Sequence, residues 1–238
     1  MVRRNTRSLA IKMLHALNYY YSLRDLEELL EIPFQVLWKY VNLINIPEEK
    51  TAKKILLAIE KRNLIRSALE DLMEKKKHEL NTLYRDICFL RLASLILEEF
   101  VLKENIDCII PLSIHALTLA SIISTEMHIR LCPVFCHSTI YENEGFYIHY
   151  YTRGKANEVD VIMIPRKCLQ GVMSPLLLDY TIGEMDMLKT VIGVLRRIKI
   201  KKVTMYFIYL SEEQINTIKE LGVENVYFLE LFKKGFNP

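Results

Sequence analysis

The chain has few residues that break regular structure, with only seven Gly, seven Pro and three Gln among 238 residues. So few breakers favour a compact chain of helices and strands over one with long loops. The sequence also lacks internal repeats and low-complexity tracts, which excludes a solenoid or a disordered chain. A composition of 51% hydrophobic and 26% charged residues is typical of a globular protein of one or two domains.

Long hydrophobic runs and an even set of Cys residues are also missing. The most apolar stretch, residues 106–125, is interrupted by Asp107, Pro111 and His115, which is too polar for a membrane span. The five Cys residues are odd in number and follow no signal peptide, so they do not form a secreted disulfide framework. We therefore expect a cytoplasmic protein with reduced thiols and no membrane contact.

A strong net charge is absent from the whole chain, but a local excess is present. The formal charge of +3 divides into +4 for residues 1–65, −1 for residues 66–105 and 0 for residues 106–238. A basic head of this kind is typical of nucleic-acid-binding domains. A solvent-exposed basic surface without a nucleic-acid partner would carry the same net charge, so charge alone does not decide between these two interpretations.

Helical periodicity and start signals predict four short helices in this head. The first ends about Tyr20, and the second spans Ser22–Glu31 with Ser22 as its N-cap. The third spans Pro33–Asn42, and the fourth begins at Pro47 and ends near residue 63.

The pattern resembles the lambda-repressor-like helix-turn-helix family. The resemblance is carried by residues 26–30, Ile32, Leu37, Tyr40, Asn42 and residues 46–51. It implies a DNA-binding domain over residues 1–64, with a protein-interaction bundle as the alternative. Trp38 departs from the small polar residue common in the family, and as a core residue it would tilt the helix. The expected DNA contacts are Phe34, Gln35, Trp38 and Lys39 in the major groove, and Arg3, Arg4, Arg7, Arg24 and Lys50 on phosphates.

Residues 65–105 form a predicted helical connector, because residues 66–105 contain neither Gly nor Pro. Ten positions in steps of three and four make a heptad-like seam: Leu69, Met73, Lys76, Leu80, Leu83, Ile87, Leu90, Ser94, Leu97 and Val101. One long helix or a break near residues 75–77 or Asn81 both fit. The seam would pack against a second chain or against the following domain.

Residues 106–238 are predicted to form an α/β domain with a mostly parallel sheet and helices on both faces. The expected strands are residues 107–111, 131–137, 159–164, 176–179, 203–209 and 226–229, with an aromatic strand at 146–151 after a turn at 142–145. Helices are expected at residues 115–127, 184–197 and 212–221.

A strand that ends in Asp179 and continues into a short loop and a helix is suited to a phosphorylated ribose. Residues 175–183, together with residues 164–169 upstream, resemble type I phosphoribosyltransferases of the purine branch. This resemblance spans about residues 106–231 and implies a site for phosphoribosyl pyrophosphate (PRPP) or a nucleotide. The expected ligand-binding residues are Asp179, Thr181, Gly183, Arg166 and Lys167.

The loop departs from the family pattern. Tyr180 stands where the second of two adjacent acids is expected, and Glu184 and Asp186 bring negative charge to the phosphate position. We therefore expect that catalysis has been lost.

Other candidate sites are weak. The spacing of His128, Cys132, Cys136 and His137 does not suit a metal, so we expect none. Arg153 and Lys155 are interpreted as solvated loop charges or contacts to an anion. Asp160 is interpreted as a strand-edge residue.

A helix-turn-helix head joined to a phosphoribosyltransferase-like domain resembles bacterial purine repressors and archaeal regulators. The expected function is a homodimeric, DNA-binding transcription regulator without catalytic activity. Its partners would be double-stranded DNA and a nucleotide-type or PRPP-like effector, with no cofactor. The alternatives are a phosphoribosyltransferase with an atypical PRPP loop and a dimerisation platform without ligand.

Overall fold

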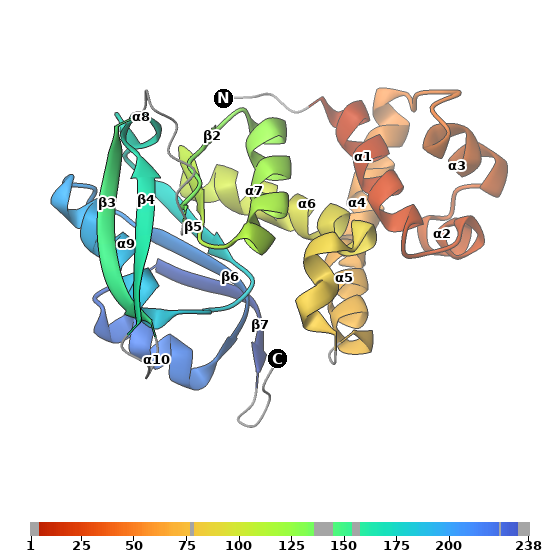
Figure 1. Ribbon diagram of the computed structural model, residues 1–238. Helices are drawn as coiled ribbons and strands as arrows, with labels where there is room; N and C mark the ends of the chain where they lie inside the picture. Colours follow the sequence, from red (N-terminus) through yellow and green to blue (C-terminus); the bar gives the residue numbers. More distant parts are fainter. Residues whose placement is uncertain (1–4, 77–78, 136–144, 154–157, 224, 233–238) are drawn as a thin grey trace. The chain divides into compact units, whose positions relative to one another are not determined.

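The computed structural model describes residues 5–76, 79–135, 145–153, 158–223 and 225–232 (Figure 1). The chain divides into two compact units, residues 1–100 and residues 101–237. The first unit therefore contains most of the segment that we predicted as a connector. No helix in the described ranges is both long and apolar enough to cross a membrane.

The first unit is helical in the part that the structure describes. Its elements are α1 (Thr6–Asn18), α2 (Leu23–Leu30), α3 (Phe34–Val41), α4 (Glu49–Lys61), α5 (Leu64–Lys75), the 3₁₀ helix η1 (Leu80–Arg85) and α6 (Ile87–Glu104), which continues into the second unit. The four helices predicted in the head are confirmed, with ends that shift by one or two residues.

Local signals in the sequence explain how α2 begins and ends. The Ser22 hydroxyl accepts a hydrogen bond from the Asp25 N–H, and the Asp25 carboxylate accepts one from the Ser22 N–H, which is a capping box. Glu31 ends the helix with a left-handed φ of 56°. Pro33 then fixes the backbone that leads into α3. Leu26 and Leu37 project from α2 and α3 into the core and are fully buried.

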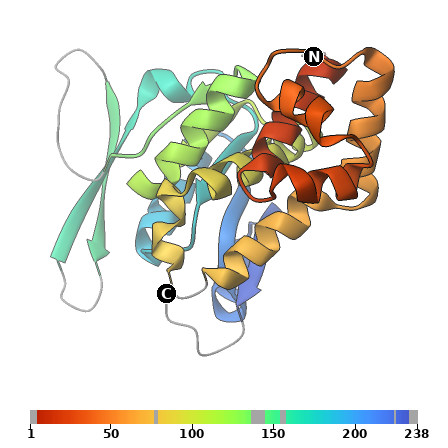
Figure 2. The same cartoon turned by 90° about the vertical axis from the view of Figure 1, so that its right-hand side faces the viewer.

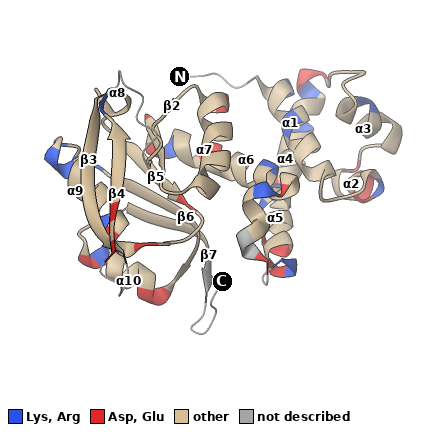
Figure 3. Cartoon of the chain, viewed as in Figure 1, with Lys and Arg blue, Asp and Glu red and all other residues tan. Residues whose placement is uncertain are grey.

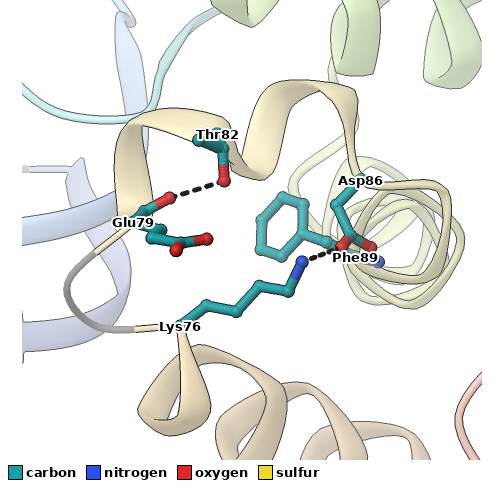
Figure 4. A network of polar contacts seen from close by, with 5 residues as sticks. All are labelled: Lys76, Glu79, Thr82, Asp86 and Phe89. Atoms are coloured by element: carbon teal, nitrogen blue, oxygen red, sulfur yellow. Dashed lines mark hydrogen bonds and ion pairs between the residues drawn. The ribbon is translucent and has the colours of Figure 1, made fainter.

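The long-helix interpretation of the connector is wrong, and the predicted break is confirmed. Residues 76–86 separate α5 from α6, and Figure 4 shows the polar contacts that fix this separation. The Lys76 ammonium pairs with the Asp86 carboxylate, which also accepts a hydrogen bond from the Phe89 N–H at 2.9 Å. Asp86 therefore caps α6 and ties its first turn to the end of α5.

The predicted seam is largely buried in the described chain. Leu69, Met73, Leu83, Leu90 and Leu97 are all buried in the single chain. Ile87, another seam position, is 57% exposed. The apolar side chains of this segment are therefore mostly used inside the chain, which leaves little of the seam for a coiled coil.

The second unit contains a five-stranded sheet and a two-stranded hairpin. Its strands are β1 (Cys108–Pro111), β2 (Arg130–Leu131), β3 (Phe146–Arg153), β4 (Glu158–Pro165), β5 (Pro175–Asp179), β6 (Thr204–Ser211) and β7 (Asn225–Phe232), and its helices are α7 (Ile114–Met127), α8 (Arg166–Leu169), α9 (Met185–Arg197) and α10 (Glu212–Glu220). The sheet has the order β2-β1-β5-β6-β7 with every pairing parallel, while β3 and β4 pair antiparallel.

Helices cover both faces of the sheet because the chain winds in two directions. The β1-α7-β2 crossover moves one way along the sheet, and the β5-α9-β6-α10-β7 path moves the other way. Right-handed crossovers in opposite directions place α7 on one face and α9 and α10 on the other, as Figure 1 shows. The β3-β4 hairpin extends at the edge of this unit (Figure 2).

The predicted α/β architecture is confirmed, with one strand shorter than expected. The β2 strand has two residues instead of the predicted 131–137, because only residues 130 and 131 pair with β1. Beyond it, Phe135 forms an isolated antiparallel bridge with Met163 of β4. Of the predicted turn at residues 142–145, residues 142–144 lie outside the described residues. Cys108, Leu177, Val191 and Phe207 are fully buried in one core between the sheet and its helices.

Candidate active site

The direction of winding reverses between β1 and β5, the neighbouring strands from which the chain departs to opposite sides. In open parallel sheets, ligands bind beyond the carboxyl ends of the strands at this switch point. A cavity of about 550 Å³ lies there. Its walls come from residues 111–114 after β1, residues 179–184 after β5, and the start of α9.

The cavity is mostly apolar, with a few polar side chains. Apolar side chains include Leu112, Ile114, Leu117, Val134, Phe135, Tyr151, Met187, Leu188 and Phe207. The polar lining consists of Ser113, Asp160, Asp179, Thr181 and Glu184. An apolar cavity with a small number of convergent polar groups is the usual form of a small-molecule site. Three of those groups are carboxylates, so the cavity favours neutral or cationic donors.

Asp179 is the buried polar centre of the cavity. Its Oδ1 accepts a 2.6 Å hydrogen bond from the Ser113 hydroxyl and a 2.7 Å bond from the Tyr180 N–H. Within the described residues, its Oδ2 accepts no hydrogen bond. Burial raises the pKa of Asp179 to about 6, although both hydrogen bonds oppose this shift. The carboxyl group thus changes protonation state close to neutral pH.

Ser113 positions Asp179 while it also starts a helix. Its hydroxyl accepts a hydrogen bond from the Ala116 N–H as the N-cap of α7, and it donates to Asp179. The prediction from sequence missed this residue. A Ser before an apolar helix is an N-cap signal, but it does not reveal a partner 66 residues away.

The loop after Asp179 is fixed at both sides. The Tyr180 carbonyl accepts a hydrogen bond from the Tyr209 N–H, and the Tyr180 side chain is buried. Tyr180 therefore replaces the family's second acid with a core residue. Gln214 of α10 donates to the Thr181 hydroxyl at 3.4 Å and to the Ile182 carbonyl at 3.3 Å. Gln214 was also missed from the sequence, because its contact depends on how α10 packs after β6.

The start of α9 places two acidic residues next to the loop that follows Asp179. Glu184 is the N-cap residue and lines the cavity, whereas Asp186 is half exposed and pairs with Lys189 at 2.9 Å. No Lys or Arg is among the described residues that line this cavity. A bare phosphate in the cavity would thus meet the Glu184 carboxylate, and none of the described lining residues supplies a positive charge.

The five predicted ligand-binding residues do not form one site. Asp179, Thr181 and Gly183 line the cavity at the carboxyl end of β5. Arg166 and Lys167 line a different cavity, which lies before the amino ends of β5 and β6. Asp160, interpreted as a strand-edge residue, lies on β4 and lines the Asp179 cavity.

The described residues that we predicted to contact DNA are exposed on the first unit, but one of them, Arg7, also makes a contact inside the unit. Phe34 and Trp38 are 39% and 44% exposed on α3, and Arg24, Gln35, Lys39 and Lys50 are exposed as well. Trp38 is therefore not a core residue. The Arg7 guanidinium donates to the Pro47 carbonyl at 2.9 Å. Arg3 and Arg4 lie outside the described residues.

Of the other candidate residues, the structure describes the side chains of His128 and Cys132 only. His128 ends α7 and Cys132 is buried, while Cys136 and His137 lie outside the described residues. Within the described ranges, no three His, Cys, Asp or Glu side chains are placed to hold a metal ion. The side chain of Arg153 and all of Lys155 also lie outside the described residues.

The fold is similar to solved structures of adenine phosphoribosyltransferases. The Giardia lamblia enzyme complexed with 9-deazaadenine matches with a TM-score of 0.53 and 10% identity, over 64% of this chain and 84% of that chain. The Thermoanaerobacter pseudethanolicus enzyme matches with a TM-score of 0.52 and 11% identity, over 64% and 86%. The Trypanosoma brucei enzyme, in complex with AMP, pyrophosphate and ribose-5-phosphate, matches with a TM-score of 0.52 and 11% identity, over 64% and 68%.

This likeness shows that the chain contains a type I phosphoribosyltransferase fold. No family model and no curated protein matches the chain by sequence. The prediction of a DNA-binding transcription regulator without catalytic activity is wrong as the main interpretation, because the similar structures are enzymes.

Proposed function

We propose that the second unit is a phosphoribosyltransferase that acts on a purine base. The observation that carries this proposal is the open Oδ2 of Asp179, which lines the switch-point cavity at the end of β5. A carboxylate in this position accepts hydrogen bonds from ribose hydroxyls. The apolar walls supply the flat, dry surface that a base requires. The likeness to adenine phosphoribosyltransferases supports a purine as the base.

In the proposed reaction, a ring nitrogen of the base forms a bond to C1′ of PRPP. The bond between C1′ and the pyrophosphate oxygen breaks, so pyrophosphate leaves with the electron pair and the ring nitrogen loses its proton. The protein contributes mainly position, since it holds the ribose through Asp179 and the base against the apolar wall. Water is excluded by side chains such as Leu112 and Phe207.

The three carboxylates of the cavity set a condition on the substrate. Asp160, Asp179 and Glu184 oppose a bare polyphosphate, because like charges at short distance repel strongly in a partly buried site. We therefore propose that PRPP enters as its complex with a divalent cation, which offsets the repulsion. In this proposal Thr181 and the backbone at Gly183 bind the 5′-phosphate, supported by their place between Asp179 and α9.

A pyrophosphate-release assay with PRPP, Mg²⁺ and adenine tests the proposal. We expect release that requires both substrates and is lost in Asp179→Asn, which has nearly the same shape but no negative charge. Asp186→Asn is the matched control, since Asp186 is half exposed and paired with Lys189 instead of lining the cavity. Release that does not exceed the Asp179→Asn background with any purine base contradicts the proposal.

For the first unit we propose the helix-turn-helix arrangement, with α2 and α3 as its two helices. The Ser22 capping box, the left-handed Glu31 and the exposed face of α3 support it. The domain boundaries near residues 64 and 105 are part of this proposal. Double-stranded DNA as a partner and a homodimer as the assembly stay predictions.

A further inference from the structure

The second unit has another cavity, of about 480 Å³, at the amino ends of the strands, whereas Asp179 lies at their carboxyl ends. Its lining includes Gly171 and Val172, which precede β5, and Ile198 and Ile200, which precede β6. The five residues of β5 separate its amino and carboxyl ends by roughly 15 Å at the usual rise of a strand. This second cavity is therefore separate from the proposed active site.

The two cavities have opposite charge. The Asp179 cavity is lined by three carboxylates, whereas Arg166 and Lys167 line the second one and none of its described lining residues is acidic. Figure 3 shows the basic positions of α8, which are Arg166 and Lys167, and further Arg residues at the end of α9. Lys199, exposed between the two lining Ile residues, adds to this positive charge. The second cavity thus favours an anion.

Arg166 is held in place by its surroundings. Its guanidinium stands 5.2 Å from the centre of the Tyr147 ring, and its Nε donates to the Phe146 carbonyl at 3.2 Å. In the described part of the chain, its two terminal nitrogens have no hydrogen-bond partner. A guanidinium that packs on an aromatic ring and keeps its terminal N–H donors available is well suited to bind a phosphate group.

Lys167 and Gly171 complete the donor set. The Lys167 ammonium is exposed and has no ion-pair partner among the described residues. Gly171 has a φ of 74°, and a Cβ built on it would meet no atom within 4 Å, so a ligand can approach its backbone. The wall beside it is fixed, because Arg130 donates to the carbonyls of Cys168 and Gln170 at 3.0 and 2.6 Å.

The structure assigns this cavity as a second binding site, specific for a phosphoryl group, in which Arg166, Lys167 and Gly171 hold the phosphate oxygens. Both cations and the Gly lie within the six residues of 166–171, so their spacing is set by local structure. The site takes either a free phosphate or pyrophosphate or the phosphate of a nucleotide. It does not depend on activity at Asp179.

Titration calorimetry of the full chain at low salt, with inorganic phosphate, pyrophosphate and AMP as separate probes, tests this site. We expect saturable binding of at least one probe, about tenfold weaker in Lys167→Met, since a charge-assisted hydrogen bond is lost. Lys167→Arg should bind as the natural chain does. Lys219→Met, which removes an exposed charge from α10, is the matched control and should not change binding.

The comparison among probes and variants decides the outcome. Tighter binding of AMP than of phosphate in Asp179→Asn identifies a nucleotide as the ligand of this cavity, and the reverse identifies the free anion. Asp179→Asn should retain binding, which separates this site from the proposed active site. Absence of saturable binding, equal affinity in Lys167→Met, or loss of binding in Asp179→Asn alone would overturn the assignment.

Discussion

Asp179 shows how one buried side chain combines a structural contact with a free ligand-binding atom. Oδ1 accepts hydrogen bonds from Ser113 and Tyr180, while Oδ2 accepts none from the described residues, and Asp179 lines the cavity. Burial raises its pKa to about 6, so its charge depends on pH in the range where enzymes operate. The proposed role in ribose binding needs the ionised form.

The pH profile of activity should report this titration. We expect kcat/KM for PRPP to rise as the pH increases through about 6, because the carboxylate is the better acceptor for ribose hydroxyls. Ser113→Ala removes a hydrogen bond that lowers the pKa of Asp179 and should move the rise to higher pH. A profile that is flat between pH 5 and 8 would argue against a role for Asp179 in substrate binding.

Glu184 provides a second test at the scale of a single residue. Glu184→Gln removes a negative charge from the cavity, and we expect the KM for PRPP to fall by roughly fivefold, which is about 1 kcal/mol. Glu213→Gln makes the same change on the exposed surface of α10 and should leave the KM unchanged. An increased KM in Glu184→Gln would show that Glu184 itself binds the substrate.

At the scale of elements, α5 and α6 depend on the Asp86 cap (Figure 4). Burial alone would raise the pKa of Asp86, but Lys76 and the Phe89 N–H outweigh it, so the pKa lies below its ordinary value. Because the folded-state pKa is lowered, the cap stabilises the fold above the unfolded-state pKa and this stabilisation is lost as the pH falls.

Asp86→Ala should therefore lower the free energy of unfolding by about 1–2 kcal/mol at pH 7, as measured by chemical denaturation. The difference from the natural chain should shrink as the pH falls below about 4. Asp71→Ala, which removes an exposed pair with Lys75 on α5, should cost less than about 0.5 kcal/mol. Equal losses for both variants would mean that Asp86 acts only as a surface charge.

The contact between α10 and the loop at Thr181 can be separated from the cap of α10 itself. Gln214→Glu keeps the acceptor that the Ser211 N–H uses but removes the amide donor to Thr181 and Ile182. We expect the KM for PRPP to rise several-fold while the melting temperature changes by only a few degrees. An unchanged KM would show that the loop is positioned without Gln214.

Over the whole molecule, the helices and strands could be predicted from the sequence better than the tertiary contacts between them. Runs such as residues 176–178 and 204–210 are buried throughout, so their strand character is visible in local pattern. Helix ends were predictable where a cap exists, as at Ser22. The two-residue length of β2 was not predictable, because it depends on which residues pair with β1 in the folded sheet.

The candidate site was only partly predictable for the same reason. Asp179 could be predicted as a site residue from its place at the end of a strand. Ser113, which donates to Asp179, and Asp160, which lines the same cavity, belong to other parts of the chain. Arg166 and Lys167 were grouped with Asp179 because residues 164–169 and residues 175–183 together carry the resemblance to type I phosphoribosyltransferases. They precede β5 whereas Asp179 ends it, so the length of that strand holds them apart.

The most direct test of the account is ³¹P nuclear magnetic resonance of PRPP mixed with the full chain, Mg²⁺ and a purine base. The account predicts that the PRPP signals decline while those of pyrophosphate and a nucleoside monophosphate grow in equal amounts. Asp179→Asn should leave PRPP intact. Unchanged PRPP with adenine, guanine and hypoxanthine alike would contradict the claim that this fold transfers a phosphoribosyl group.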